Sequence, residues 1–338
     1  MTRPAVDWNL AQSVGVRLAP KGPVLDRAST FATVAMLRDL AAEAVDLVAE
    51  VTELQVPSGP AAVIVDRPRW IKANIAGLRD AVDPLLTQSG ILPAVSSGAV
   101  AVQMGAALAW LSTRVLGQFE VFGGQPGHRP GQLLLLAPTI VNVERQLGVP
   151  PRDFRLWVCL HEEAHRLQFA AAPWLTQVLL DQLRIFLDAA DEDALTMVRR
   201  IASSVRSQDG SWMERMQAPA QRQAFATMTA VMSLLEGHAD VVMDAVGPAV
   251  IESLPTIRQR FEARRDHAVG LNAIIRRVLG MDLKLRQYRE GAAFVRQVQS
   301  LVGVRGFNAV WANSSNLPTA TEISDPAAWV RRMHPALV

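Results

Sequence analysis

Two histidines and a glutamate stand in an H-E-x-x-H pattern within residues 156–169. His161 and His165 are four residues apart, so on a helix they lie on one face and can bind the same metal ion. Two neutral imidazoles suit zinc, which takes nitrogen ligands at about 2.0–2.1 Å in a tetrahedral shell. Glu162 is rotated by about 100° from His161, where it can act as general base on a metal-bound water. The alternative is a core helix whose two histidines are merely hydrogen-bonded.

A catalytic zinc needs one more protein ligand, and the residues directly after His165 offer none. Segment 166–171 lacks the glycine and third histidine that would extend the motif. A glutamate on a later helix is the other common solution, and Glu236 interrupts an apolar helical run where an unpaired carboxylate would be costly. Asp240 lies four residues on, hence on the same face, and can orient a ligand histidine by a hydrogen bond. We expect His161, His165 and Glu236 to bind zinc. Asp240 is expected to accept a hydrogen bond from one of the ligand histidines.

A competing candidate for the third ligand is His238. Residues two apart on a helix differ by about 200°, so Glu236 and His238 cannot both face one metal ion. Only Glu236 brings Asp240 to the same face, and we therefore expect Glu236 rather than His238. The simpler alternative is that Glu236, Asp240 and Asp244 form a solvated polar face.

The elements that must position these residues are mostly helical. Apolar residues recur every three or four positions on both sides of the motif. Before the motif, this spacing predicts helices over 26–51, over 98–116 and from 140 to Gly148, and one more that starts at Asp66. The motif itself is expected to lie on a helix. After it, helices are predicted over 174–189, 194–206, 218–245, 249–266, 270–279, 283–302 and 304–312, and a last one starts at Asp325-Pro326. Residues 1–24 are expected to be irregular. Residues 119–122 and 133–137 flank a glycine-rich loop and predict a short β-hairpin, which we expect to lie beside the H-E-x-x-H helix.

A stretch without charge runs from Asp83 to Arg114. Its length invites a transmembrane interpretation, but Gly90 and Pro93 divide it and many of its residues are small or polar. We expect instead a buried helix over 98–116, whose small residues let neighbouring helices pack closely, and no membrane association.

Composition gives the chain an ordinary globular character. Of 338 residues, 50% are hydrophobic and 20% charged, and the net charge of +2 provides no strong field for nucleic acid. Cys159 is the one cysteine; it points away from the metal side of the helix and is expected to be a packed, inert thiol. The first residues show no apolar signal-peptide core, so cytoplasmic localisation is expected. The oligomeric state is left open.

Several longer segments resemble a known group of proteins. The H-E-x-x-H motif with a later E-x-x-x-D is similar to gluzincin-type zinc peptidases. More narrowly, the chain resembles a bacterial zincin-like family described as zinc-dependent metalloproteases or hydrolases, some members being associated with biosynthesis of a deazaflavin cofactor. The segments that carry the resemblance are 6–8, 65–68 with Trp70, 153–158, 235–240 and 284–288. It implies a mainly α, zincin-like helical body that binds zinc. We expect one such domain over 1–338, in which 1–116 forms an N-terminal helical subregion.

Stabilisation of the oxyanion has three candidates in the sequence. Zincins often use a tyrosine or histidine to hydrogen-bond the oxyanion of the tetrahedral intermediate. Tyr288, the one tyrosine in the chain, is the first candidate, with Arg286 and His267 as the others. The alternative is that these residues form a packing or ion-pair seam.

Taken together, these patterns predict a zinc-dependent metallohydrolase, specifically a peptidase, with Glu162 and Tyr288 as catalytic residues. Its substrate would be a peptide or a small amide. Two alternatives stay open at this point: a noncatalytic zincin-fold protein that binds a partner, and a hydrolase of a non-peptide amide. All three need the same metal ligands, so the sequence does not separate them.

Overall fold

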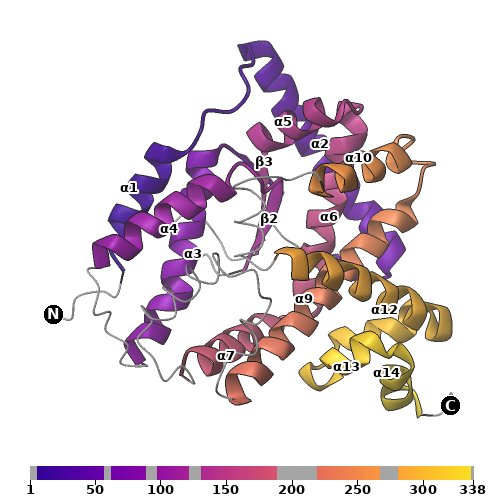
Figure 1. Cartoon of the computed structure of the whole chain (residues 1–338). Helices are drawn as coiled ribbons and strands as arrows, with labels where there is room; N and C mark the ends of the chain where they lie inside the picture. The colour runs from indigo at the N-terminus through magenta and orange to yellow at the C-terminus, as the bar shows by residue number, and fades with distance from the viewer. Residues whose placement is uncertain are drawn as a thin grey trace. The chain divides into compact units, whose positions relative to one another are not determined.

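The structure is a computed structural model that describes residues 6–56, 62–88, 97–121, 131–188, 219–266 and 281–335 (Figure 1). The helices predicted over 194–206 and 270–279, most of the glycine-rich loop, and His267 lie outside the described residues. Within them the protein is mainly α-helical, as the sequence predicts. Among the described residues, no helix is both long enough and apolar enough to cross a membrane.

The chain divides into two compact units. Unit 1 contains residues up to Val51, then Val56–Leu167 and Val246–Ala263; unit 2 contains Thr52–Gln55, Gln168–Ala245 and Arg264–Val338. Each unit is therefore built from separated parts of the chain. The expectation of a single domain, with a subregion over 1–116, stays a prediction.

Unit 1 contains a small sheet. Among the described residues its strands are β1 (Val63–Val65), β2 (Gly117–Glu120) and β3 (Gln132–Leu136), in the order β1-β3-β2. The pairing of β2 with β3 is antiparallel, which confirms the predicted hairpin. The parallel pairing of β1 with β3 was not predicted, because three residues are too few to show an alternating pattern. Residues 133–136 are buried on both faces of the central strand, which explains their continuous run of leucine.

The expectation of an irregular segment over residues 1–24 holds for residues 19–24 but is wrong for residues 8–18. Helix α1 (Trp8–Leu18) begins there, with the Asp7 carboxylate accepting a hydrogen bond from the Leu10 amide as N-cap. Trp8 and Ala11 are buried, three positions apart on one face. The segment has too few large apolar residues for this face to stand out in the sequence.

Close packing of α1 against α4 (Ser97–Leu111) uses small residues, as predicted for the charge-free stretch. A side chain at Gly105 would collide with the Ala11 carbonyl, and one at Gly15 would come within 2.9 Å of Ile71 Cγ2. Ile71 belongs to α3 (Arg67–Gln88). Figure 1 shows α1, α3 and α4 side by side in the indigo-to-purple part of the chain.

A buried arginine joins the ends of these helices. The Arg67 side chain is 5% exposed; its Nε donates to the Ser112 carbonyl at 3.2 Å and its Nη1 to the Pro20 carbonyl at 2.8 Å. Burial lowers the pKa of Arg67 from its ordinary value. Ser112 directly follows α4, so the cation lies at the negative end of that helix.

The remaining helices of unit 1 lead to the motif. They are most of α2 (Arg27–Thr52), α5 (Ala137–Leu147), most of α6 (Pro151–Ala171), and α10 (Leu254–Asp266) for most of its length. Helix α5 ends at Gly148, whose φ of 61° is left-handed. Arg155 of α6 forms a buried two-point ion pair with Glu144 of α5, at 2.7 and 2.9 Å. These contacts fix the beginning of α6.

Among the described residues of unit 2, all regular secondary structure is helical. Its elements are α7 (Leu175–Asp188), α9 (Pro219–Val246, apart from its last residue), α12 (Met281–Phe307), η1 (Asn308–Trp311), η2 (Ser314–Asn316), α13 (Ala320–Ser324) and α14 (Pro326–Met333). Gly303, with φ 72°, interrupts α12 where the sequence predicts a break between two helices. The backbones of α9 and α12 touch at Gly237 and Gly291, where neither position has room for a side chain.

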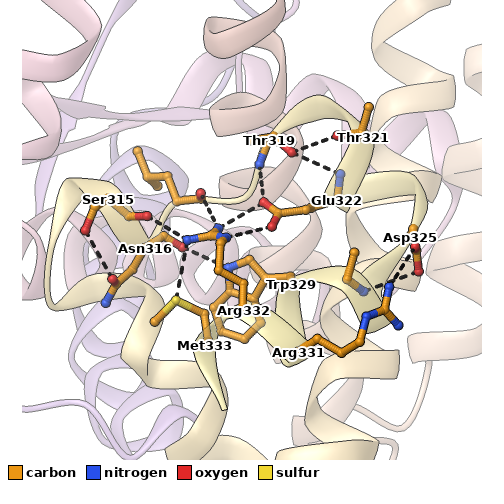
Figure 2. Close-up of polar contacts among 12 residues, drawn as sticks. Ser315, Asn316, Thr319, Thr321, Glu322, Asp325, Trp329, Arg331, Arg332 and Met333 are labelled. Carbon is orange, nitrogen blue, oxygen red and sulfur yellow. Dashed lines mark hydrogen bonds and ion pairs between the residues drawn. The ribbon is translucent and has the colours of Figure 1, made fainter. Parts of the chain in front are cut away.

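Polar contacts connect the short helices in the C-terminal part of unit 2 (Figure 2). Arg332 pairs with both oxygens of Glu322, at 2.7 and 2.9 Å, and donates to the carbonyls of Ser315 and Leu317. Helix α14 begins after Asp325, whose carboxylate caps it, as predicted from Asp325-Pro326.

Replacing Arg67 by methionine should destabilise unit 1. The substitution keeps apolar volume but removes charge-assisted hydrogen bonds to two carbonyls, so we expect a loss of about 2 kcal/mol in the free energy of unfolding. Urea denaturation measures it. The matched control is Arg69→Met at an exposed position of the same helix, expected to change stability by less than about 0.5 kcal/mol. Equal effects of the two substitutions would refute the role given to Arg67.

Candidate metal centre

The two motif histidines converge on one side of α6. Their Nε2 atoms are 3.2 Å apart, with ring centroids 4.7 Å apart and ring planes at 84°. Two Zn–N bonds of about 2.05 Å at a tetrahedral angle put the nitrogens roughly 3.3 Å apart. Both side chains are partly exposed, whereas residues 156–160 before them are buried. The pair therefore fits zinc and can be reached from outside the core; the distance alone would also suit a hydrogen bond.

Glu162 follows His161 directly and lies against the sheet. Its side chain is 6% exposed and packs on Gly117, the first residue of β2. A Cβ atom at Gly117 would lie 2.6 Å from Cγ of Glu162 and 2.9 Å from its Oε1. The hairpin therefore lies beside the motif helix, as predicted. The sequence did not single out Gly117, because a lone glycine at a strand end is common.

An ion pair and a thiol are buried on α6 near the motif. Glu163 and Arg166 form an ion pair of 2.6–3.0 Å; burial raises the pKa of Glu163 and Arg166 opposes that rise. Cys159 is fully buried, and burial, followed by the charges of Glu162 and Glu163, raises the pKa of its thiol. A thiol with little thiolate is unreactive, which confirms the expected packed cysteine.

Helix α9 carries Glu236, partly exposed, between the buried residues Leu235 and His238. The His238 ring stacks on Phe307, at 5.2 Å and 25° between planes. Gln168, which is fully buried, donates from Nε2 to the Leu235 carbonyl at 2.9 Å, and the same nitrogen lies 3.0 Å from His238 Nδ1. A single amide thus holds α9 on both sides of Glu236. No pattern in the sequence predicts this contact.

Of the other predicted site residues, Asp240 lies on α9 and Arg286 and Tyr288 lie on α12. Asp240 lies 3.6 Å from Arg296 Nη2, which also pairs with Asp244 at 2.8 Å. Its predicted hydrogen bond to a ligand histidine stays a prediction. Tyr288 and Arg286 belong to the described backbone of α12, but their side chains lie outside the described residues, as does His267.

The comparison with known families gives the class of this mainly α protein. The profile of the zincin-like metallopeptidase family matches residues 6–330, so the chain belongs to that family. Zinc is therefore its cofactor, and hydrolysis its class of reaction.

A solved structure from Chloroflexus aurantiacus supports the same assignment. It is described as "a putative hydrolase with a novel fold" and shares 30% sequence identity with this chain, with a TM-score of 0.71. The match covers 97% of this chain and 98% of the other. No curated protein matches the sequence. These comparisons confirm the family resemblance and name neither a substrate nor a deazaflavin cofactor.

Replacing either motif histidine should remove zinc. We expect about one zinc ion per chain in the wild type and a small fraction of that in His161→Ala and His165→Ala, because each loses one of the three predicted protein ligands. Elemental analysis after dialysis against a weak chelator measures the content. His334→Ala is the control, since His334 lies on the C-terminal segment beside the Gly306 carbonyl. Full zinc content in both motif variants would contradict the assignment.

Proposed function

We propose that the chain is a zinc-dependent peptidase in which His161, His165 and Glu236 hold the metal ion and Glu162 is the general base. The observation that carries this proposal is the 3.2 Å approach of the two histidine nitrogens on α6. Glu162, the residue directly after His161, is buried against the sheet. The three proposed ligands offer two imidazole nitrogens and a carboxylate oxygen, a donor set typical of zinc hydrolases.

Contacts within unit 2 support Glu236 as the third ligand. Gln168 follows His165 by three residues and His161 by seven on the continuous helix α6, so all three share one face. Gln168 bonds to the carbonyl of Leu235, the neighbour of Glu236. The His238 ring is instead occupied: its Nδ1 faces the Gln168 amide, and its plane stacks on Phe307. This arrangement favours Glu236 over His238.

The proposed chemistry is attack of water on an amide carbonyl. Zinc, when bound, supplies Lewis-acid chemistry that polarises a carbonyl and lowers the pKa of water. Glu162 takes the proton from the attacking water and returns it to the leaving amine. Burial against Gly117 holds the carboxylate in place for both transfers. Asp240 is proposed to orient a ligand histidine.

Strand β2 is the proposed docking edge for an extended peptide. It lies at the end of the strand order among the described residues. The Leu136 amide donates to the Leu116 carbonyl, so Gly117 and Leu135 form a non-hydrogen-bonded pair in the antiparallel ladder. The backbone N–H and C=O of Gly117 therefore point away from β3. An extended substrate could pair there, next to Glu162.

Tyr288 is the proposed donor to the oxyanion. Helix α12 touches α9 at Gly291 and Gly237, and Gly237 follows Glu236 directly. Tyr288 precedes Gly291 by three residues, so its backbone lies about one helical turn from that crossing. Arg286 and His267 are the other candidates for this role.

Substitutions on α9 distinguish the two candidate ligands. Glu236→Ala should lower zinc content sharply, because it removes a ligand. His238→Phe should keep most of the zinc, because an aromatic ring can still stack on Phe307. Elemental analysis of both purified variants measures the effect. Loss of zinc in His238→Phe with retention in Glu236→Ala would reverse the assignment.

The activity is tested by replacing Glu162 with glutamine. The amide keeps the shape of the side chain but cannot accept a proton, so we expect unchanged zinc content and hydrolysis lower by at least about 100-fold. Glu43→Gln, at a surface position of α2, is the control. Cleavage is measured on a broad peptide library and on non-peptide amides.

The outcome also separates the alternatives. A wild type that binds zinc and cleaves only non-peptide amides is an amide hydrolase of another kind. A wild type that binds zinc and cleaves nothing is a binding protein, and the peptidase proposal then fails.

A further inference from the structure

We propose that Gly117 is a positioning residue: the hydrogen in place of its side chain leaves the space in which the Glu162 carboxylate is held. This inference rests on the proposed function, because it assigns Gly117 a role through the proposed general base. It rests on contacts within unit 1.

The evidence is a close approach between a strand and a side chain. A Cβ at Gly117 would lie 2.6, 2.8 and 2.9 Å from Cγ, Cδ and Oε1 of Glu162. Real Cβ atoms essentially never come this close to a non-bonded heavy atom. All three atoms belong to the part of Glu162 that carries its function. Even the smallest side chain at position 117 therefore competes with the carboxylate for the same space.

The strand is less free to yield than the side chain. Gly117 is paired with Leu135 of the central strand, and the preceding carbonyl, of Leu116, accepts a 2.8 Å hydrogen bond from Leu136. Leu135 and Leu136 are fully buried, so moving this part of β2 would disturb the core. Rotation about the side-chain bonds of Glu162 requires no such change. A methyl group at position 117 should displace the carboxylate and leave the fold intact.

This division predicts a particular kind of defect. Replacing a glycine that is needed for its backbone conformation lowers the stability of the fold. Replacing a glycine that positions a catalytic group lowers kcat instead. A misplacement of about 1 Å can lower the rate of an enzyme on the order of 100-fold. The histidine side chains are not among the atoms that the new Cβ would meet most closely, so zinc binding should survive.

The test is Gly117→Ala in the full-length, zinc-loaded protein. We expect kcat to fall on the order of 100-fold, with zinc content unchanged and a melting temperature close to that of the wild type. Gly98→Ala is the matched control: a Cβ there meets only Leu10 Cδ2, at an ordinary 3.6 Å, and kcat should stay within about twofold of the wild-type value. A kcat for Gly117→Ala that also stays within this range would overturn the inference, and so would failure of the variant to fold.

A double-mutant comparison asks whether the effect passes through Glu162. In a Glu162→Gln background, adding Gly117→Ala should lower the residual kcat little further, because both changes disable the same proton transfer. If Gly117→Ala lowers kcat by the same factor in the Glu162→Gln background as in the wild type, Gly117 acts independently of Glu162 and the inference is overturned.

A crystal structure of Gly117→Ala gives a readout that does not depend on activity. We expect the Glu162 carboxylate to be displaced while the Nε2 atoms of His161 and His165 keep their separation. If the wild type hydrolyses nothing, the proposed function has failed, but this structure still decides the inference. A carboxylate in its wild-type place beside the new methyl group would overturn it.

Discussion

The approach of His161 and His165 on one face of α6 is the constraint on which the rest of the site depends. Residues four apart on one helix can bring two imidazoles within 3.2 Å of each other, and the rotation of α6 sets the direction in which the pair faces. The first turns of α6 are held to α5 by the ion pair of Arg155 with Glu144, whereas Glu163 and Arg166 pair with each other within α6. These ion pairs are desolvated, so breaking one partner would leave an uncompensated charge. The helix is thereby anchored while the histidines stay accessible.

Glycine acts at two places next to the site, and for the same physical reason. At Gly117 it admits the Glu162 side chain against a strand, and at Gly237 it admits the backbone of α12 against α9 beside Glu236. At Gly117 the missing Cβ leaves space for a side chain, and at Gly237 it lets two helix backbones meet. Packing around the proposed site therefore relies on closeness of main chains as much as on large apolar side chains.

The sequence could predict what has a strong local signal. The motif helix, the long helix that carries Glu236, the hairpin and the stop at Gly148 each follow from spacing or from turn-forming residues, and the family assignment agrees with the motif. Helix α1 was missed because its buried face is short, and β1 because it has three residues. Gln168 and Gly117 could not be found in this way, since their roles come from contacts with residues 67 and 45 positions away in the chain.

The central claim is that one zinc ion is held by two histidines and a glutamate with a position left open for water. A crystal structure of the zinc-loaded protein, with anomalous data collected at the zinc absorption edge, tests it most directly. The account predicts one zinc peak bonded to Nε2 of His161, Nε2 of His165 and a carboxylate oxygen of Glu236, with water in the remaining position. A zinc ion whose fourth coordination position is filled by a protein side chain, or one bound without Glu236, would contradict it.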